Sequence, residues 1–265
     1  MMKKIKIILD GTVVPFLIYV GITFITLFTY ESVGMISGTI DPTNPSTINS
    51  FFVQGIASAF IVVIFFPLYR RFKRIYEIKE DPFRVRKALY VIPLAFSICI
   101  IGNIVLMYMP VVDDNGVTKQ IFDTVEKYGM GVGLVMVAVL IPIVEEYIFR
   151  GFMFGSAYIL KGEIFSIIFT SLVFAFVHMN ITQGIYAFFA GIFLGYVRYR
   201  YANLTYTMIM HLVMNASSII FVPAITLLSG VRDKIFMVAI CIVLAIMSIY
   251  KINEYGEKNS NMEVL

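Results

Sequence analysis

The residues with the types and spacing for chemistry are three charged side chains, Glu145, Glu146 and Arg150, within a long apolar run. The run extends from about Gly131 to Leu160 and contains no other charged residue. A charge at the centre of a bilayer costs roughly 2.5 to 3.5 kcal/mol on insertion scales, so such residues usually have a function. A buried carboxylate can act as a general acid or base, or it can belong to an ion pair that only joins two helices.

Helical spacing assigns different partners to the two acids. Glu146 and Arg150 are four residues apart with the acid first, which is the favourable order for an ion pair on one helical face. An α-helix has about 3.6 residues per turn, so Glu145 is rotated by about 100° from Glu146. We therefore expect Arg150 to neutralise Glu146, and we expect Glu145 to face another neighbour.

The chain contains two histidines, and both lie in apolar segments. Histidines within a membrane are candidates for proton relay, ligand binding or catalysis. If Gly162 is the apex of a helical hairpin, Glu145 is 17 residues before it and His178 is 16 residues after it. Both residues then lie roughly 25 Å from the turn along their helix axes, so we expect them at one height on antiparallel helices. Together they could activate a water, as general-base catalysis requires.

The second histidine, His211, is four residues before Asn215, so both side chains share one helical face. They could donate hydrogen bonds to the negative charge of an acyl transition state. They could instead join two helices through hydrogen bonds worth about 0.6 to 2 kcal/mol each. The preceding apolar run, 184–197, spans only about 20 Å. His211 therefore reaches the height of His178 only if the turn near Asn203 is buried in the protein.

The elements that must position these residues are membrane helices. The 265 residues are 59% hydrophobic and 14% charged, with a mean hydropathy of +0.87, which is far from soluble averages. We expect an all-α, polytopic membrane bundle of about eight transmembrane helices. It should form a single domain, 1–265, with the catalytic core at about 130–223. The expected helices are 12–30, 51–69, 88–109, 131–160, 164–177, 184–197, 204–222 and 236–250.

Charge distribution predicts the orientation in the membrane. Basic residues gather between 70 and 87, which places this loop in the cytoplasm by the positive-inside rule. The segments 31–50 and 110–128 carry more acidic than basic residues and are expected outside. Both termini are then cytoplasmic, and in a prokaryote the protein would lie in the cell membrane.

The net charge of +4 is modest, so we expect no nucleic-acid partner. Cys99 and Cys241 lie in expected helices, where packing is their expected role.

The charged residues and histidines resemble the three motifs of the CPBP family. This family comprises intramembrane CAAX prenyl endopeptidases and bacteriocin-processing or self-immunity proteins, once called Abi proteins. Its motifs are Glu-Glu-x-x-x-Arg, Phe-x-x-x-His, and His-x-x-x followed by Asn or an aliphatic residue. All three are present in the family's order, at 145–150, 174–178 and 211–215. Phe174, which opens the second motif, is expected to pack beside the site.

The resemblance implies an intramembrane endopeptidase. It implies that Glu145 and His178 activate a water for attack on a peptide carbonyl, and that Glu146 supports the site through its arginine. It also implies that His211 and Asn215 stabilise the oxyanion. The partners would be the lipid bilayer and a membrane-embedded peptide or lipidated protein, whose apolar tail approaches through the bilayer.

Alternatives for the cofactor and the function stay open at this point. Two histidines and two glutamates are residue types that bind zinc. However, the chain has no His-Glu-x-x-His pair and Glu145 and Glu146 are expected to point apart, so we expect no cofactor. The resemblance also implies metal-free hydrolysis. The main alternative is a non-catalytic self-immunity or partner-binding protein, and a second is a proton-coupled transporter, although no internal repeat is visible.

Overall fold

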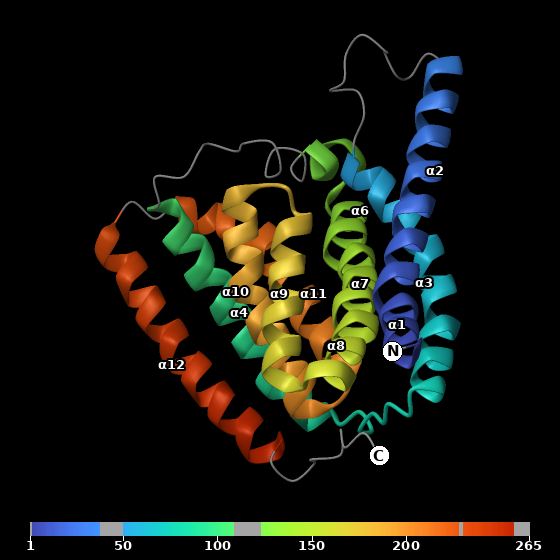
Figure 1. Ribbon diagram of the computed structural model, residues 1–265. Helices are drawn as coiled ribbons and strands as arrows, with labels where there is room; N and C mark the ends of the chain where they lie inside the picture. Colours follow the sequence, from blue (N-terminus) through green and yellow to red (C-terminus); the bar gives the residue numbers. More distant parts are fainter. Residues whose placement is uncertain (1, 38–49, 109–122, 228–229, 257–265) are drawn as a thin grey trace.

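The fold is a bundle of helices that run in alternating directions (Figure 1). The computed structural model describes residues 2–37, 50–108, 123–227 and 230–256, and every element in these ranges is helical. The first segment joins α1 (Met2–Ile8), the π-helix η1 (Leu9–Val13) and α2 (Val14–Ile36). The other single helices are α3 (Ser50–Ile75), α4 (Val85–Met107), α9 (Glu163–Val177), α10 (Ile181–Tyr201), α11 (Leu204–Thr226) and α12 (Val231–Gly256).

The central segment, called here the motif helix, extends from Met130 to Lys161 and changes its helical type along its length. It comprises α6 (Met130–Gly133), the π-helix η3 (Leu134–Leu140), α7 (Ile141–Glu146), the π-helix η4 (Tyr147–Met153) and α8 (Phe154–Lys161). Gly162 then forms the predicted hairpin turn to α9, with a φ of 79° that suits glycine. Both glutamates of the first motif therefore lie in the short α-helical part between two π-helical turns.

The described residues confirm a polytopic, all-helical membrane protein. Six helical segments are long and apolar enough to span a membrane, α9 is a shorter apolar helix, and α10 has 21 residues. These eight segments correspond to the eight expected from the sequence. The six are Met2–Ile36, Phe52–Ile75, Val85–Met107, Met130–Lys161, Leu204–Ile225 and Val231–Gly256.

Several helices are longer than the apolar runs that predicted them. α2 continues to Ile36, and α10 begins after Asn180, whose side chain accepts a hydrogen bond from the N–H of Gln183 at 2.9 Å. Hydropathy marks the part of a helix that suits hydrocarbon, whereas caps determine where the helix begins and ends. Much of the two segments predicted to lie outside, namely 38–49 and 110–122, falls beyond the described residues. The side on which they lie stays a prediction.

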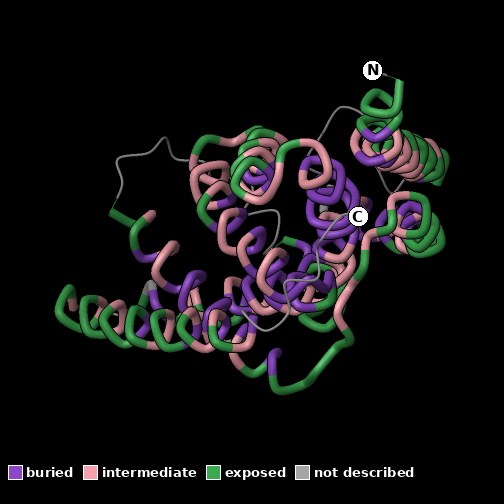
Figure 2. Tube along the Cα trace, turned by 60° about the horizontal axis from the view of Figure 1, so that its bottom comes forward, coloured by how far each residue is buried: buried purple, intermediate pink, exposed green. Residues whose placement is uncertain are grey.

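Buried residues concentrate in the middle of the bundle, around the motif helix (Figure 2). Half of its most apolar stretch is buried, compared with 11% for Met2–Ile36 and 17% for α12. The outer helices expose their apolar side chains, as helices that face lipid do. Aromatic side chains of α3 and the motif helix, including Phe65 and Phe152, pack edge to face at 5.5 Å between ring centroids. The motif helix is therefore fixed by neighbours on several sides.

The turn between α10 and α11 is buried, as the height of His211 required. Ala202 is 2% exposed and Asn203 is 8% exposed. The loop between α3 and α4 covers this turn, because the N–H of Asp81 donates to the carbonyl of Ala202 at 3.1 Å. The side-chain amide of Asn203 donates to the carbonyl of Asp81 at 2.6 Å. α11 consequently begins inside the protein, and this start allows His211, seven residues later, to reach the depth of the glutamates on the motif helix.

Glu80, in the same loop, collects donors from three helices. Its carboxylate accepts hydrogen bonds from Lys73 at 2.5 Å, from the Tyr69 hydroxyl at 2.9 Å and from the N–H of Leu204 at 3.2 Å. It also lies 3.1 Å from Nη2 of Arg198. Burial alone would raise the pKa of Glu80, but the charges of Arg198 and Lys73 outweigh burial and hold its pKa below the ordinary value of 4.5.

This lowered pKa predicts a loss of stability in acid. A carboxyl group whose pKa is lower in the folded state stabilises the protein above its unfolded pKa, and this contribution disappears as the pH falls through the folded value. We expect the melting temperature of the wild type to fall more steeply below about pH 5 than that of Glu80→Gln, which should already be lower at neutral pH. Melting curves of both proteins across this range check the prediction, and parallel curves would contradict it.

Candidate active site

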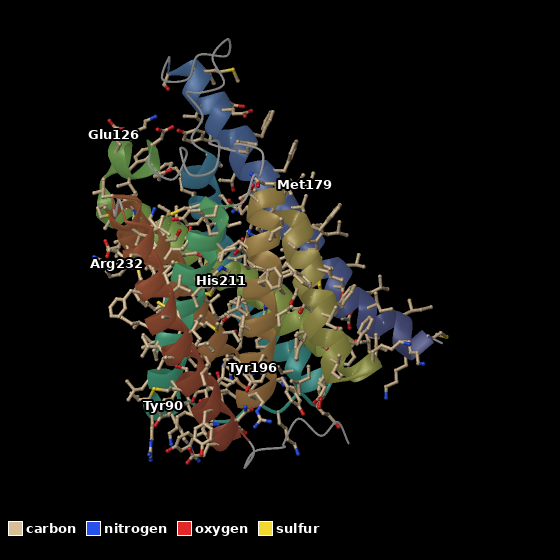
Figure 3. All side chains as sticks on the ribbon, turned by 90° about the vertical axis from the view of Figure 1, so that its left-hand side faces the viewer. Tyr90, Glu126, Met179, Tyr196, His211 and Arg232 are labelled. Atoms are coloured by element: carbon tan, nitrogen blue, oxygen red, sulfur yellow. The ribbon has the colours of Figure 1, made fainter. Side chains whose placement is uncertain are left out.

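His211 lies near mid-height of the bundle, below Met179 and above Tyr196 in Figure 3. Its Nδ1 is 2.9 Å from Oε1 of Glu146, and its Nε2 is 3.6 Å from Oε2 of Glu145. Both acids thus meet one imidazole, which corrects the expectation that they point apart toward different neighbours. The reason is that the ring comes from α11, opposite the motif helix, and presents its two nitrogens in different directions.

The predicted ion pair between Arg150 and Glu146 is present. Nη1 of Arg150 is 3.2 Å from Oε1 of Glu146, and both side chains are fully buried. The guanidinium also lies over the ring of Phe174 at 4.4 Å, and its Nη2 is 3.5 Å from the carbonyl oxygen of Gly191. Glu146 is therefore shared between Arg150 and His211, and it balances positive charge at a position that is closed to solvent.

Exposure separates the two acids. The side chain of Glu145 is 16% exposed, whereas that of Glu146 is 0% exposed. A general base must reach a water, and a group that only orients a neighbour need not. The geometry therefore suits Glu145 for proton transfer and Glu146 for holding His211.

Phe174 lies inside the cluster rather than only beside it. Its ring packs edge to face against His178 at 4.7 Å and against His211 at 5.6 Å between ring centroids. The carbonyl oxygen of Phe174 is 2.6 Å from Nδ1 of His178. Among the described contacts, His178 joins the cluster through Phe174 and not through Glu145. Because Nδ1 of His178 donates to this carbonyl, Nε2 of the neutral ring is an acceptor.

Asn215 donates a hydrogen bond to a backbone carbonyl of the motif helix that has lost its usual donors. The N–H of Ile141 donates to Met136 five residues earlier, and Pro142 has no N–H to donate. The carbonyl of Val137 thus loses its usual donors within the helix, and it accepts a hydrogen bond from Nδ2 of Asn215 at 3.1 Å. This contact fixes α11 against the motif helix. The second N–H of the Asn215 amide is not needed for it.

The π-helical turns on both sides of Glu145 and Glu146 have no clear sequence pattern. π-helical turns are rare in proteins and frequently occur at functional sites. Pro142 is a signal for the first turn, since it removes a backbone donor. We find no comparable signal for the second turn, which contains Arg150.

No group of three or more His, Cys, Asp or Glu side chains in the described part of the chain is arranged to hold a metal ion. A cation bound to Glu146 would also lie next to the guanidinium of Arg150, 3.2 Å from the same carboxylate. The expectation of a site without a cofactor stays a prediction, and it is taken up below.

Arg198 is a site neighbour that was not among the candidates from the sequence. It is fully buried, and its Nε donates to the backbone carbonyl of Arg150 at 3.0 Å. A basic residue near the end of an apolar run, followed closely by Arg200, is an ordinary topology signal. Its burial depends on contacts with distant segments, which a local pattern does not reveal.

The fold defines a polytopic helical membrane protein, and the contacts define a cluster of two glutamates, an arginine and a histidine inside the bundle. Residues 129–217 match the family model described as type II CAAX prenyl endopeptidase Rce1-like. The match includes all three motifs and confirms the resemblance to the CPBP intramembrane proteases. No curated protein and no solved structure matches the chain. The family is one of proteases of the CAAX type, which act in membranes.

Proposed function

We propose that this protein is an intramembrane endopeptidase that hydrolyses a peptide bond in a membrane-embedded or lipidated, CAAX-type substrate. The observation that carries the proposal is the position of His211 between the buried Glu146 and the partly exposed Glu145. One carboxylate can then exchange protons with water while the other holds the imidazole. An ion pair that only joined two helices would not require one buried carboxylate and one that reaches solvent.

In the proposed reaction, Glu145 is the general base. It takes a proton from a water whose oxygen forms a bond to the carbonyl carbon of the substrate. Nε2 of His178 is the acceptor that shares in orienting this water, since its Nδ1 is engaged with Phe174. When the tetrahedral intermediate collapses, the C–N bond breaks and the proton on Glu145 passes to the leaving amine. The products are a carboxylate and a free amine.

His211 and Asn215 are the proposed donors to the oxyanion. Nδ1 of His211 donates to Glu146, so donation from Nε2 requires a ring that carries both protons. At 3.6 Å, Nε2 is beyond hydrogen-bond distance of Glu145, so it can donate to a developing negative charge. Asn215 would add its second amide N–H. The Glu146–Arg150 pair holds the ring in place, as a buried carboxylate does for a catalytic histidine.

The bilayer restricts the substrate class. The outer helices expose apolar side chains to lipid, so a substrate with an apolar or lipidated tail can reach the protein within the membrane. In a host that prenylates proteins, a CAAX-type protein fits this requirement. In a host that does not, an exported or bacteriocin-like peptide fits the same chemistry.

The experiment that tests this function compares newly formed peptide termini in host membranes that express the wild type or Glu145→Gln at matched levels. Termini present only with the wild type would support the peptidase and identify its substrate. If no terminus depends on Glu145 while a host phenotype survives the substitution, the enzyme proposal fails. The self-immunity or partner-binding function would then take its place.

Metal-free hydrolysis predicts resistance to chelators. We expect wild-type activity in proteoliposomes to stay within about twofold after treatment with 1,10-phenanthroline, because no proposed step uses a metal ion. A zinc peptidase reconstituted in the same lipid is the control and must lose its activity. Inactivation of this protein that added zinc reverses would contradict the prediction.

A further inference from the structure

The guanidinium of Arg198, on α10, reaches three acceptors in different parts of the fold. Its Nε donates to the backbone carbonyl of Arg150 at 3.0 Å, and its Nη2 donates to the Tyr69 hydroxyl at 3.1 Å. The same Nη2 is 3.1 Å from the carboxylate of Glu80. A fully buried arginine is unfavourable unless its charge and donors are matched. These three contacts provide a carboxylate for the charge and two oxygens for Nε and Nη2.

The carbonyl of Arg150 can accept this bond because the motif helix is π-helical there. In an α-helix, the N–H of Phe154 would donate to Arg150, four residues earlier. In the structure it is directed to the carbonyls of Phe149 and Gly151. Arg198 therefore supplies a donor in place of the N–H of Phe154, and a buried carbonyl without a donor is costly.

Arg150 connects this contact to the candidate active site. Its backbone is held by Arg198, and its side chain pairs with Glu146, which in turn binds His211. A π-helix has more residues per turn than an α-helix. Conversion of η4 to an α-helix would therefore rotate Arg150 relative to Glu146 and change the geometry of the pair that holds His211.

We propose that Arg198 is a positioning residue that keeps η4 in its π-helical form and thereby holds Arg150 against Glu146. Glu80 and Tyr69 hold the guanidinium from the other side, so the loop between α3 and α4 is linked to the site. The kinetic part of this proposal rests on the proposed peptidase function. The structural part, that Arg198 maintains η4, is independent of it.

The alternative is that Arg198 is only one of the basic residues that set the topology, and Arg200 is the matched control for it. Arg200 lies two residues later on the same helix, and its Nη2 donates to the carbonyl of Asn253 on α12 at 2.8 Å. Its substitution removes the same charge and a hydrogen bond of the same kind, but none of the contacts that Arg198 makes with Arg150, Tyr69 and Glu80. Arg198→Lys is the conservative variant, since a lysine keeps the charge near Glu80 without the planar fork that reaches three acceptors.

The first measurement is amide hydrogen exchange of the full-length wild type, Arg198→Gln, Arg198→Lys and Arg200→Gln in lipid nanodiscs. We expect exchange in residues 147–154 to accelerate by about fivefold or more in both Arg198 variants. We expect no such change in this segment for Arg200→Gln. If Arg198→Gln does not fold, Arg198→Lys carries the test. Unchanged exchange at 147–154 in the folded Arg198 variants would overturn the proposal.

The second measurement is the turnover of the same proteins on a cleavable membrane peptide, per folded molecule. We expect kcat to fall about tenfold or more in both Arg198 variants with KM within about twofold, because the site is misaligned while the substrate contacts are unchanged. A decrease that only follows the amount of folded protein, or one equal in Arg200→Gln, would overturn the positioning role. If the wild type has no peptidase activity, the proposed function fails, and hydrogen exchange alone decides the role of Arg198.

Discussion

Replacement of Glu145 by Gln is expected to lower kcat by about 10³-fold and to leave the fold intact. Glutamine keeps the size and most of the hydrogen-bonding capacity of glutamate, but it cannot take a proton from water. The side chain is 16% exposed and lies 3.6 Å from Nε2 of His211, beyond a hydrogen bond, so its charge is not required to close a buried network. Single-turnover cleavage in proteoliposomes measures the loss, and thermal melting checks the fold.

Glu77→Gln is the control for this experiment. Glu77 is an exposed acid in the loop between α3 and α4, so its substitution removes the same charge far from His211. We expect Glu77→Gln to cleave at the wild-type rate. A Glu145→Gln protein that retains more than about a tenth of wild-type turnover would remove Glu145 from the role of base.

Replacement of Arg150 by Met should have the largest effect on stability. The substitution leaves the carboxylate of Glu146 fully buried without its guanidinium partner. Removal of one partner from a buried ion pair typically costs about 3 to 5 kcal/mol. The contact of the guanidinium with the ring of Phe174, at 4.4 Å, is lost as well. We expect a large decrease in the melting temperature of the purified protein and a low yield of folded protein.

The double variant Glu146→Gln with Arg150→Met distinguishes the effect of an unpaired buried charge from the effect of altered packing. It removes both charges and retains side chains of similar volume, so we expect most of the lost stability to return. Its activity should stay low, because glutamine holds His211 less strongly than a carboxylate does. Recovery of stability without activity would support the role of Glu146 in the site. A single Arg150→Met variant as stable as the wild type would contradict the buried-pair interpretation.

The sequence was informative about the helices and about the residues of the motifs. Apolar runs located the eight helical segments, because hydrocarbon-spanning helices need about 20 apolar residues. The spacing of Glu146 and Arg150 predicted their ion pair, and a common height of His211 and His178 required a buried turn near Asn203. Both features depend on neighbours within one or two helices, where local geometry is sufficient.

Contacts between distant segments could not be predicted in the same way. The position of His211 between both glutamates depends on how α11 packs against the motif helix, 65 residues away in sequence. The loop contact from Asp81 to Ala202 joins segments that are farther apart, and no local pattern marks it. The second π-helical turn, which exposes the carbonyl of Arg150 to Arg198, lacks even a proline as a signal. The predicted common height of Glu145 and His178 does not say what His178 touches, and in the structure its ring packs on Phe174.

The measurement that tests the central claim most directly is cleavage of a lipidated membrane peptide by the purified protein in proteoliposomes made with H₂¹⁸O. Wild type and Glu145→Gln are compared at equal amounts of folded protein, and mass spectrometry follows the new carboxyl terminus. The account predicts a product from the wild type that carries ¹⁸O in this carboxyl group, with formation slowed by about 10³-fold in Glu145→Gln. Equal product formation by the two proteins, or no cleavage of lipidated and unlipidated membrane peptides by the wild type, would contradict it.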